Sequence, residues 1–198
     1  MLLTEDKEAA DKVRKWSTQS REAAPWYQHE EMGYNYRMSN VIAGVVRGQF
    51  PYLEEHIAQK KAIYMRYQEG FKDLPVRMNP YDGEHSVPNF WLSCLLIDEK
   101  AMCPQTLGET QGTYEKQPGK TCPMEILNKL AEHNAEGRPI WKPMHLQPIY
   151  RDNPFVAAAP GADVGKDIFQ RGLCLPSDNK MTTQQQDRLI EIVRSCFE

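Results

Sequence analysis

The chain has 198 residues, of which 40% are hydrophobic and 26% are charged, and its formal net charge is −3. This length corresponds to about one domain, and the composition is that of a globular protein that buries a core. The small negative charge excludes the basic field that draws nucleic acid or anionic membranes without specificity. No apolar run approaches the roughly 20 residues of a membrane-spanning helix, and the first residues lack a signal-peptide pattern. We therefore expect a cytoplasmic protein that binds neither nucleic acid nor membrane.

The first third of the chain predicts two helices joined by an unusual loop. Residues 1–4 (MLLT) read as the end of a strand, and residues 5–20 follow as a helix with acidic residues first and basic residues later. Ser39 and Asn40 are helix-capping residues at the start of a second apolar-periodic helix. Proline removes a backbone donor, so Pro51 predicts a kink, after which the helix resumes as far as Gly70.

The remainder alternates between strands and helices. Alternation of apolar residues predicts strands near residues 76–79 and 89–98, whereas residues 100–123 are dense in Gly, Pro and Thr and read as one long loop. Further predictions are a helix at 124–137 closed by Gly137, a strand and proline turns at 138–150, a short helix and extended stretch at 162–177, and a last helix from 182 onward capped by Thr182 or Thr183. The fold class is α/β of the α+β type, with a long kinked helix and a small, mostly antiparallel sheet that carries helices on one side.

Standard catalytic and metal-binding motifs are missing from the sequence. The segment HEEMG at His29 lacks the second histidine of a zinc protease, and no nucleophile elbow, phosphate-binding loop or dinucleotide fingerprint is present. The five cysteines form no C-x-x-C pair and favour reduced thiols, although Cys103 and Cys122 flank one loop and could meet. Histidine spacing also fits no metal site. We predict no catalytic residue and no metal ligand in this chain.

Two clusters carry the chemistry that remains. The first is Gly33-Tyr34-Asn35-Tyr36-Arg37, in which an amide and a guanidinium stand before a helix N-terminus, as in an anion-binding loop. The alternative is that Arg37 pairs with a nearby carboxylate, Glu30 or Glu31, while the tyrosines pack in the core.

The second cluster is the segment 138–148, RPIWKPMHLQP. Its three prolines hold Trp141, Lys142, His145 and Gln147 on a rigid frame, which suits a sugar or nucleotide pocket. The alternative is a buried tryptophan beside a cation.

Three segments together resemble one family. The segments YQHEEMGYNYRMSNVIAGVVRGQF, RPIWKPMHLQP and RGLCLPS, in this order, closely resemble the DegT/DnrJ/EryC1/StrS family of pyridoxal phosphate (PLP)-dependent nucleotide-sugar aminotransferases. The resemblance covers nearly the whole chain apart from the loop at residues 100–123. The residues of these segments are similar to those of members that aminate UDP-linked 4-keto sugars in the biosynthesis of polysaccharides and glycans.

The resemblance implies a fold and a division of the chain. The family fold is that of aspartate-aminotransferase-like (fold type I) enzymes, and this chain resembles its C-terminal portion. Residues 1–38 would be a remnant of the edge of the large PLP domain with the interface loop, and residues 39–198 the small C-terminal domain with the interdomain helix. The lysine that holds the cofactor covalently lies upstream in the family, and Lys7, Lys12 and Lys15 do not match its position.

The resemblance also assigns roles to the two clusters. Asn35 would bind the cofactor phosphate in the neighbouring subunit, and Arg37 would bind the diphosphate of the sugar nucleotide or brace the loop. His145, Trp141 and Lys142 would line the sugar side of the cleft. PLP is the cofactor of the intact family, and we expect this chain alone not to bind it stably.

Three functional hypotheses follow from the resemblance. In the first, the chain is the C-terminal domain of an aminotransferase that uses a nucleotide sugar and glutamate, and it is inactive alone because the lysine is absent. In the second, it is a non-catalytic subunit or scaffold that pairs with a full-length homologue. In the third, it belongs to a PLP-dependent sugar dehydratase. Each predicts a homodimer or a larger partner, because apolar residues around Tyr34, Tyr36 and 41–46 would otherwise be exposed.

Overall fold

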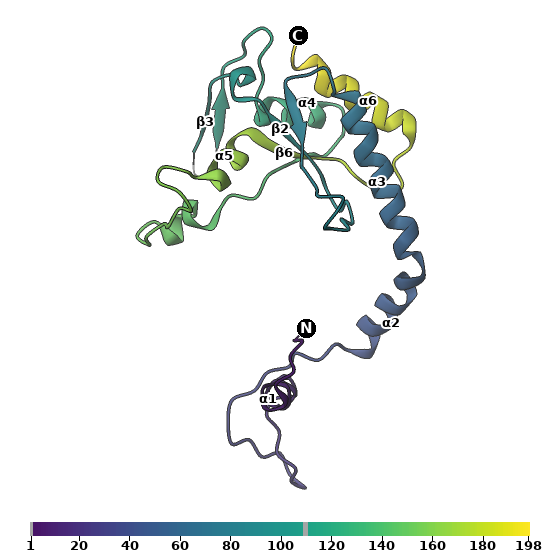
Figure 1. Cartoon of the computed structure of the whole chain (residues 1–198), viewed down its shortest axis with the longest axis vertical. Helices are drawn as coiled ribbons and strands as arrows, with labels where there is room; N and C mark the ends of the chain where they lie inside the picture. Colours follow the sequence, from purple (N-terminus) through teal and green to yellow (C-terminus); the bar gives the residue numbers. More distant parts are fainter. Residues whose placement is uncertain (1, 109–110) are drawn as a thin grey trace. The chain divides into compact units, whose positions relative to one another are not determined.

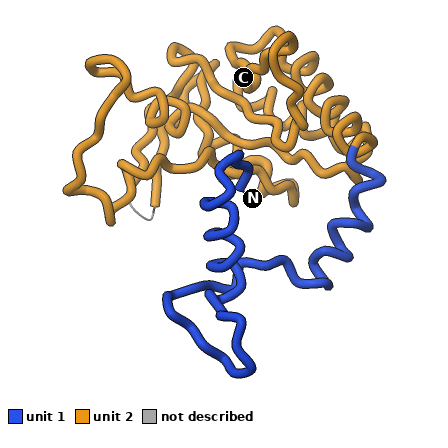
Figure 2. Tube along the Cα trace, turned by 60° about the horizontal axis from the view of Figure 1, so that its bottom comes forward, with its two compact units in different colours: residues 1–53 blue, residues 54–198 orange. Residues whose placement is uncertain are grey.

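The computed structural model describes residues 2–108 and 111–198. The chain divides into two compact units, residues 1–53 and residues 54–198 (Figure 2). The domain division predicted from the sequence, residues 1–38 and 39–198, stays a prediction. No helix in the part of the chain that the structure describes is both long and apolar enough to cross a membrane.

The first unit consists of two helices and the loop that joins them. Helix α1 (Lys7–Ser17) begins after Asp6, whose carboxylate accepts a hydrogen bond from the Ala9 amide at 3.1 Å. Helix α2 (Asn40–Gln49) begins after Ser39, which caps it as predicted. The strand predicted at residues 1–4 is wrong for residues 2–4, which lie outside any strand, because no neighbouring segment pairs with their backbone. Met1 lies outside the described residues.

The predicted kink at Pro51 is confirmed. Helix α2 ends at Gln49, a 3₁₀ turn η1 (Phe50–Tyr52) contains the proline, and helix α3 (Leu53–Gly70) follows. Proline is tolerated at the first positions of a helix, where its missing N–H would have no intrahelical acceptor, so the chain restarts a helix there instead of ending it.

The second unit is built on a four-stranded antiparallel sheet (Figure 1). Its order is β1 (Val76–Met78), β2 (Ser93–Ile97), β6 (Gly172–Leu175) and β5 (Arg138–Pro139). In the central pair Leu95 lies opposite Leu173, which places large aliphatic side chains on the same face. The predicted small antiparallel sheet is confirmed.

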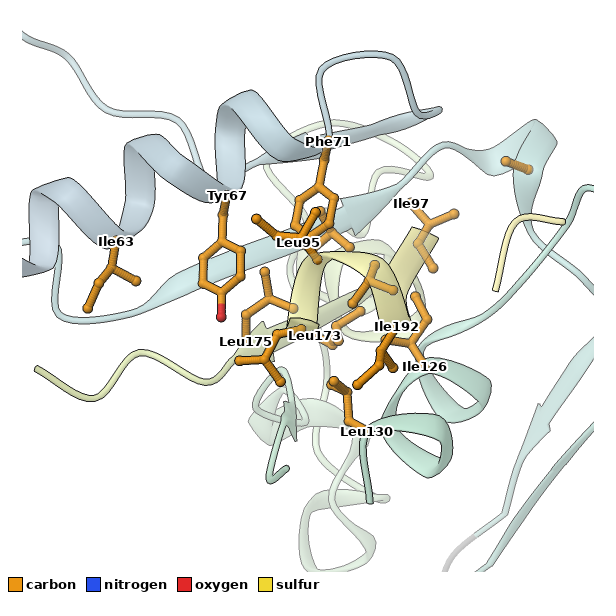
Figure 3. Packing of buried hydrophobic residues seen from close by; sticks show 14 residues of the cluster. Ile63, Tyr67, Phe71, Leu95, Ile97, Ile126, Leu130, Leu173, Leu175 and Ile192 are labelled. Atoms are coloured by element: carbon orange, nitrogen blue, oxygen red, sulfur yellow. The ribbon is translucent and has the colours of Figure 1, made fainter. Parts of the chain in front are cut away.

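Helices α3, α4 (Pro123–Glu132) and α6 (Thr183–Ser195) supply the other side of the core (Figure 3). Tyr67 of α3, Leu130 of α4 and Val193 of α6 are fully buried against the sheet leucines. Burying such side chains supplies the largest favourable term in folding, about 1.5–3 kcal/mol for each large apolar residue. Helix α6 begins with a capping box between Thr182 and Gln185, which confirms Thr182 as the cap.

Two local predictions are wrong. Residues 100–123 were expected to be one irregular loop, but β3 (Gln105–Leu107) and β4 (Gly112–Tyr114) pair there as an antiparallel ladder after a 3₁₀ turn, η2 (Glu99–Ala101). The ladder was missed because strands of three residues are too short to show a periodic pattern. Residues 109–110 of the predicted loop lie outside the described residues. Helix α4 ends at Glu132, because Asn134 takes a left-handed conformation (φ 57°) before Gly137 is reached.

The segment between β5 and β6, residues 140–171, contains turns and a short helix, as predicted. It contains two 3₁₀ turns, η3 (Met144–Leu146) and η4 (Pro148–Tyr150), followed by helix α5 (Val164–Arg171). These turns hold the proline-containing cluster on the surface of the second unit.

Candidate functional site

The loop that carries Asn35 is hydrogen-bonded to the end of α1. The Tyr34 amide donates to the Trp16 carbonyl at 2.7 Å, and the Tyr36 amide donates to the Ser17 carbonyl at 3.1 Å. Asn35 itself forms an isolated antiparallel bridge with Thr18. The backbone on both sides of Asn35 is therefore anchored, which directs its side chain reproducibly.

Gly33 makes this close approach possible. A Cβ atom at residue 33 would lie 2.2 Å from the Ser20 amide nitrogen and 2.3 Å from the Gln19 carbonyl carbon. Gln19 and Ser20 are themselves in left-handed conformations, with φ values of 66° and 51°. Only glycine fits against this turn, so the glycine of the motif has a steric role.

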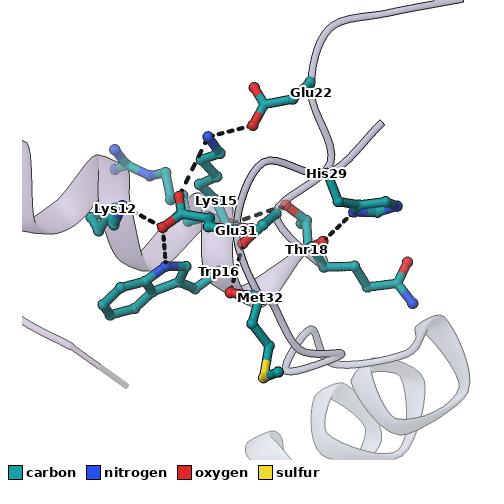
Figure 4. Close-up of polar contacts among 11 residues, drawn as sticks. Lys12, Lys15, Trp16, Thr18, Glu22, His29, Glu31 and Met32 are labelled. Carbon is teal, nitrogen blue, oxygen red and sulfur yellow. Dashed lines mark hydrogen bonds and ion pairs between the residues drawn. The ribbon is translucent and has the colours of Figure 1, made fainter. Parts of the chain in front are cut away.

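A cluster of charged residues closes the base of the loop (Figure 4). The Glu31 carboxylate accepts hydrogen bonds from the Lys12 ammonium at 2.6 Å and from the Trp16 indole N–H at 3.1 Å. Lys15 forms an ion pair with Glu22 at 2.5 Å and with Glu31 at 3.4 Å. The hydrogen bonds from Lys12 and Trp16 lower the pKa of Glu31 from its ordinary 4.5 to about 2. Glu31 is thus held in its charged form.

The alternative interpretation of the first cluster does not hold. Arg37 forms no ion pair with a carboxylate anywhere in residues 2–108 and 111–198, since Glu31 is already bound by Lys12 and Trp16. Tyr34 and Tyr36 do not enter a core but stack on each other, with ring centroids 5.2 Å apart, and both are exposed. The amide of Asn35 and the guanidinium of Arg37 remain available to a ligand.

These two side chains line an open cavity of about 680 Å³ in the first unit. Arg21 also lines it and lies over the Tyr27 ring, 4.3 Å from the ring centroid. Glu22 also lines the cavity, but its carboxylate is ion-paired with Lys15 at 2.5 Å. Two guanidinium groups and an amide that line one cavity form a set of donors suited to a phosphate or another oxyanion. The residues present therefore fit the phosphate group of a cofactor or nucleotide.

The predicted help from a helix N-terminus is not seen. The cavity is bordered by Ser17, Thr18 and Gln19 at the end of α1, and the Ser39 hydroxyl already accepts from the Ile42 amide at the start of α2. The C-terminal end of a helix repels anions slightly. Attraction of an anion to this cavity therefore depends on Arg21, Arg37 and Asn35.

In the second unit, Trp141 lies on the surface. It is 64% exposed, and its ring centroid is 6.0 Å from that of Trp91, with an angle of 39° between the planes. Lys142 is half-buried, and its backbone carbonyl accepts a hydrogen bond from the side-chain amide (Nε2) of Gln147 at 3.5 Å. The alternative of a buried tryptophan beside a cation is wrong, because Trp141 is exposed and does not belong to the core.

His145 is the best-positioned side chain of the second cluster. Its Nε2 atom lies 2.8 Å from Oδ2 of Asp163, and Phe155 stacks on the imidazole with ring centroids 3.9 Å apart. The other Asp163 oxygen accepts from the Lys166 amide at 2.9 Å. This amide, followed by His145, lowers the pKa of Asp163. The charged carboxylate therefore fixes the orientation of the ring through Nε2.

The sequence did not identify Asp163 or Phe155. Asp163 stands directly before helix α5, so its capping role was visible in the sequence, but its second bond to His145 joins residues 18 apart through loops without periodicity. The sequence also missed a cavity of about 690 Å³ in the second unit, which is lined by Trp91, Arg138 and Cys174 rather than by Trp141, Lys142 or His145. Within the described residues no group of three or more Asp, Glu, His or Cys side chains is arranged to hold a metal ion.

Comparison with known proteins identifies the relatives of this chain. Residues 1–194 match the model of the DegT/DnrJ/EryC1/StrS aminotransferase family. EpsN of Bacillus subtilis, named provisionally as a pyridoxal phosphate-dependent aminotransferase, is 36% identical over 198 residues, which are 100% of this chain and 46% of EpsN. The GDP-perosamine synthase of Escherichia coli O157:H7 is 24% identical over 198 residues, 100% of this chain and 47% of that protein. The chain spans about half the length of these relatives.

A solved structure shows the same fold. A sugar aminotransferase of Streptococcus pneumoniae, provisionally so named and solved in its PLP form, superimposes with a TM-score of 0.74 over 98% of this chain and 44% of that one. The two sequences are 17% identical, so this likeness concerns the fold.

Proposed function

Because the chain belongs to the DegT/DnrJ/EryC1/StrS aminotransferase family, we propose that it forms the C-terminal part of a PLP-dependent aminotransferase that acts on a nucleotide-linked keto sugar. The observation that carries this proposal is the cavity of the first unit, where Asn35 and Arg37 present donors that no side chain of the described residues occupies. Family membership supplies the cofactor class, and the cavity supplies groups that bind its phosphate.

In this proposal the first unit holds phosphate. The Asn35 amide donates to a phosphate oxygen of the cofactor in a neighbouring subunit, and Arg37, with Arg21 beside it, neutralises the charge of that phosphate or of the nucleotide diphosphate. When bound, PLP supplies the electron sink that allows an amino group to be exchanged between glutamate and a keto sugar. The anchored loop keeps these donors in place before the ligand arrives, which lowers the entropy cost of binding.

None of the lysines near this cavity is assigned to the covalent attachment of the cofactor. Lys12 and Lys15 are ion-paired with Glu31 and Glu22, and the hydrogen bond that Lys15 donates to Glu22 raises the pKa of Lys15. The raised pKa keeps Lys15 protonated, and a protonated amine does not act as a nucleophile. In this proposal, the lysine that attaches the cofactor comes from another polypeptide segment.

The second unit is assigned to the sugar. Trp141 offers an exposed aromatic face, and Lys142 and His145 offer polar groups, as sugar-binding pockets require. Asp163 holds the imidazole of His145 in a fixed orientation through Nε2. We propose UDP as the nucleotide, from the sequence resemblance; the relatives named GDP-perosamine synthase make GDP the competing nucleotide to test.

The exposed face of α2 supports a proposed homodimer or a pairing with a full-length relative. None of the residues of α2 is buried, and Val41, Val45 and Phe50 are more than half exposed. A Cβ at Gly44 or Gly48 would meet nothing within 4 Å, so these glycines make no close packing within the described chain. An apolar helix face of this kind is typical of a protein interface.

Analytical ultracentrifugation tests the proposed dimer. Val45→Glu should weaken self-association, whereas Lys61→Glu on α3 should not. A chain that stays monomeric at all concentrations contradicts the dimer.

The experiment that tests the proposed function is a titration of the ¹⁵N-labelled chain with PLP, inorganic phosphate, UDP and GDP. We expect the side-chain resonances of Asn35, Arg21 and Arg37 to shift. Arg37→Ala should weaken binding roughly 10- to 150-fold, since a charge-assisted hydrogen bond contributes roughly 1.5–3 kcal/mol. The charge-matched control is Arg47→Ala on α2, which should leave binding unchanged.

Two outcomes contradict the proposal. If Arg37→Ala and Arg47→Ala bind phosphate equally well, the cavity is not the phosphate site. One equivalent of cofactor attached to a single lysine after borohydride reduction would show that one of the chain's own lysines attaches PLP.

A further inference from the structure

Two cysteines lie opposite each other at the centre of the sheet. Cys94 of β2 is paired with Cys174 of β6, and their Sγ atoms are 3.7 Å apart. The residues are 80 positions apart in the sequence, so only the sheet register brings them together. The core lies on the opposite face, where Leu95 and Leu173 point.

The backbone hydrogen bonds show which kind of cross-strand pair this is. The Cys94 amide donates to Oδ1 of Asn79 at 2.8 Å, and the Cys94 carbonyl accepts from the Asn79 amide at 3.0 Å. Both backbone groups of Cys94 thus point toward the β1 side and away from β6. Cys94 and Cys174 are therefore a non-hydrogen-bonded antiparallel pair, whose Cα atoms lie about 4.5 Å apart and whose side chains are closest. That spacing falls within the roughly 4.4–6.8 Å that a disulfide spans.

The surroundings make one of the two thiols reactive. Arg138 of β5 is paired with Cys174 on the side away from β2, and both residues line the 690 Å³ cavity of the second unit. The hydrogen bond from the Cys94 thiol lowers the pKa of Cys174, burial opposes this shift, and the charge of Arg138 adds to the lowering. The same contact and burial raise the pKa of Cys94. Cys174, which lines the cavity, is thus the more acidic of the two thiols, and Cys94 is the less acidic.

We propose that Cys94 and Cys174 form a redox-active dithiol, a modification site that hydrogen peroxide converts into a disulfide between β2 and β6. The Cys174 sulfur attacks one peroxide oxygen, the O–O bond breaks, and hydroxide leaves and takes up a proton to become water. The resulting sulfenic acid is attacked by the Cys94 sulfur, which loses its proton as the S–O bond breaks and a second water leaves. Two thiols and one peroxide give one disulfide and two waters.

The test is peptide mapping of the native chain after treatment with equimolar hydrogen peroxide and alkylation of the remaining thiols. The expected product has lost two hydrogens and contains the Cys94–Cys174 peptide link, which dithiothreitol reverses. In Cys94→Ser the link is lost and a sulfenic acid at Cys174 is trapped by dimedone. In Cys174→Ser both products are lost.

The matched controls are Cys103→Ser and Cys122→Ser, which change two other buried cysteines of the same unit and should leave the link intact. A link between Cys103 and Cys122 in place of the predicted one overturns the proposal. So does oxidation of Cys174 that occurs only after the protein is unfolded. Because the unmodified chain is mapped directly, a variant that fails to fold does not decide the outcome.

Discussion

The two units of this chain are stabilised by different forces. Residues 54–198 bury a continuous core in which side chains from α3, α4, α6 and the sheet are removed from water. Residues 1–53 contain helices α1 and α2, neither of which has a buried residue, and their loop is held by ion pairs and backbone hydrogen bonds. Residues 1–53 thus form a polar scaffold that leaves apolar side chains exposed, as a binding surface requires. Residues 54–198, in contrast, are stabilised by their own buried core.

The largest difference between the two units should appear in the free energy of unfolding when a core residue is truncated. Leu173 is fully buried between the sheet and the helices, so Leu173→Ala should reduce the free energy of unfolding by about 2–5 kcal/mol through lost burial and a new cavity. Val41→Ala, at a residue that is 76% exposed, should change it by less than about 0.5 kcal/mol. Urea unfolding followed by circular dichroism measures both; equal effects would remove the contrast between the units.

A substitution at Gly33 should destabilise the loop of the first unit and leave the stability of the second unit unchanged. Gly33→Ala places a methyl group 2.2 Å from the Ser20 amide nitrogen, a clash that should cost the loop about 1–3 kcal/mol. Hydrogen exchange of the Tyr34 and Tyr36 amides, which are bonded to the end of α1, should accelerate. The control is Gly44→Ala, which meets no atom within 4 Å and replaces a poor helix former. Unchanged exchange in Gly33→Ala would show that the turn relaxes.

Acid should release the same loop. Because the folded state lowers the pKa of Glu31 from 4.5 to about 2, its contacts stabilise the loop above pH 4.5 and are lost as the pH falls toward 2. The indole N–H resonance of Trp16, bonded to Glu31, reports the loss. Glu31→Gln should lack this transition, and a transition that persists in this variant must come from another group.

The smallest expected effect concerns an ion pair on the second unit. Arg66 of α3 contacts Asp187 of α6 through two oxygens, the shortest contact being 2.6 Å, but both side chains are about half exposed. Solvent screens such pairs, so a double-mutant cycle with Arg66→Ala and Asp187→Ala should give about 0.2–1 kcal/mol. A larger coupling would mean that ion pairs stabilise the second unit as well as the first.

Much of the fold could be predicted because its signals are local. The proline break at residues 49–53, the Thr182 cap and the strand at 93–97 each follow from a few adjacent side chains. The ladder of β3 and β4 was missed because strands of three residues are too short for a period, and the strand expected at residues 2–4 was wrong because a strand needs a partner that no local pattern reveals.

For the site, the sequence by itself determined which chemistry was available: an amide and a guanidinium beside Gly33, and an aromatic, a lysine and a histidine between prolines. Only the tertiary structure decided which of these groups are free. Glu31 is bound to Lys12, and Arg37 has no carboxylate partner among the described residues. Asp163 orients His145, and Cys94 meets Cys174. These contacts join residues 18 to 80 positions apart. Side-chain type is set by each residue alone, but its partner is set by the chain reversals and strand register that bring distant segments together.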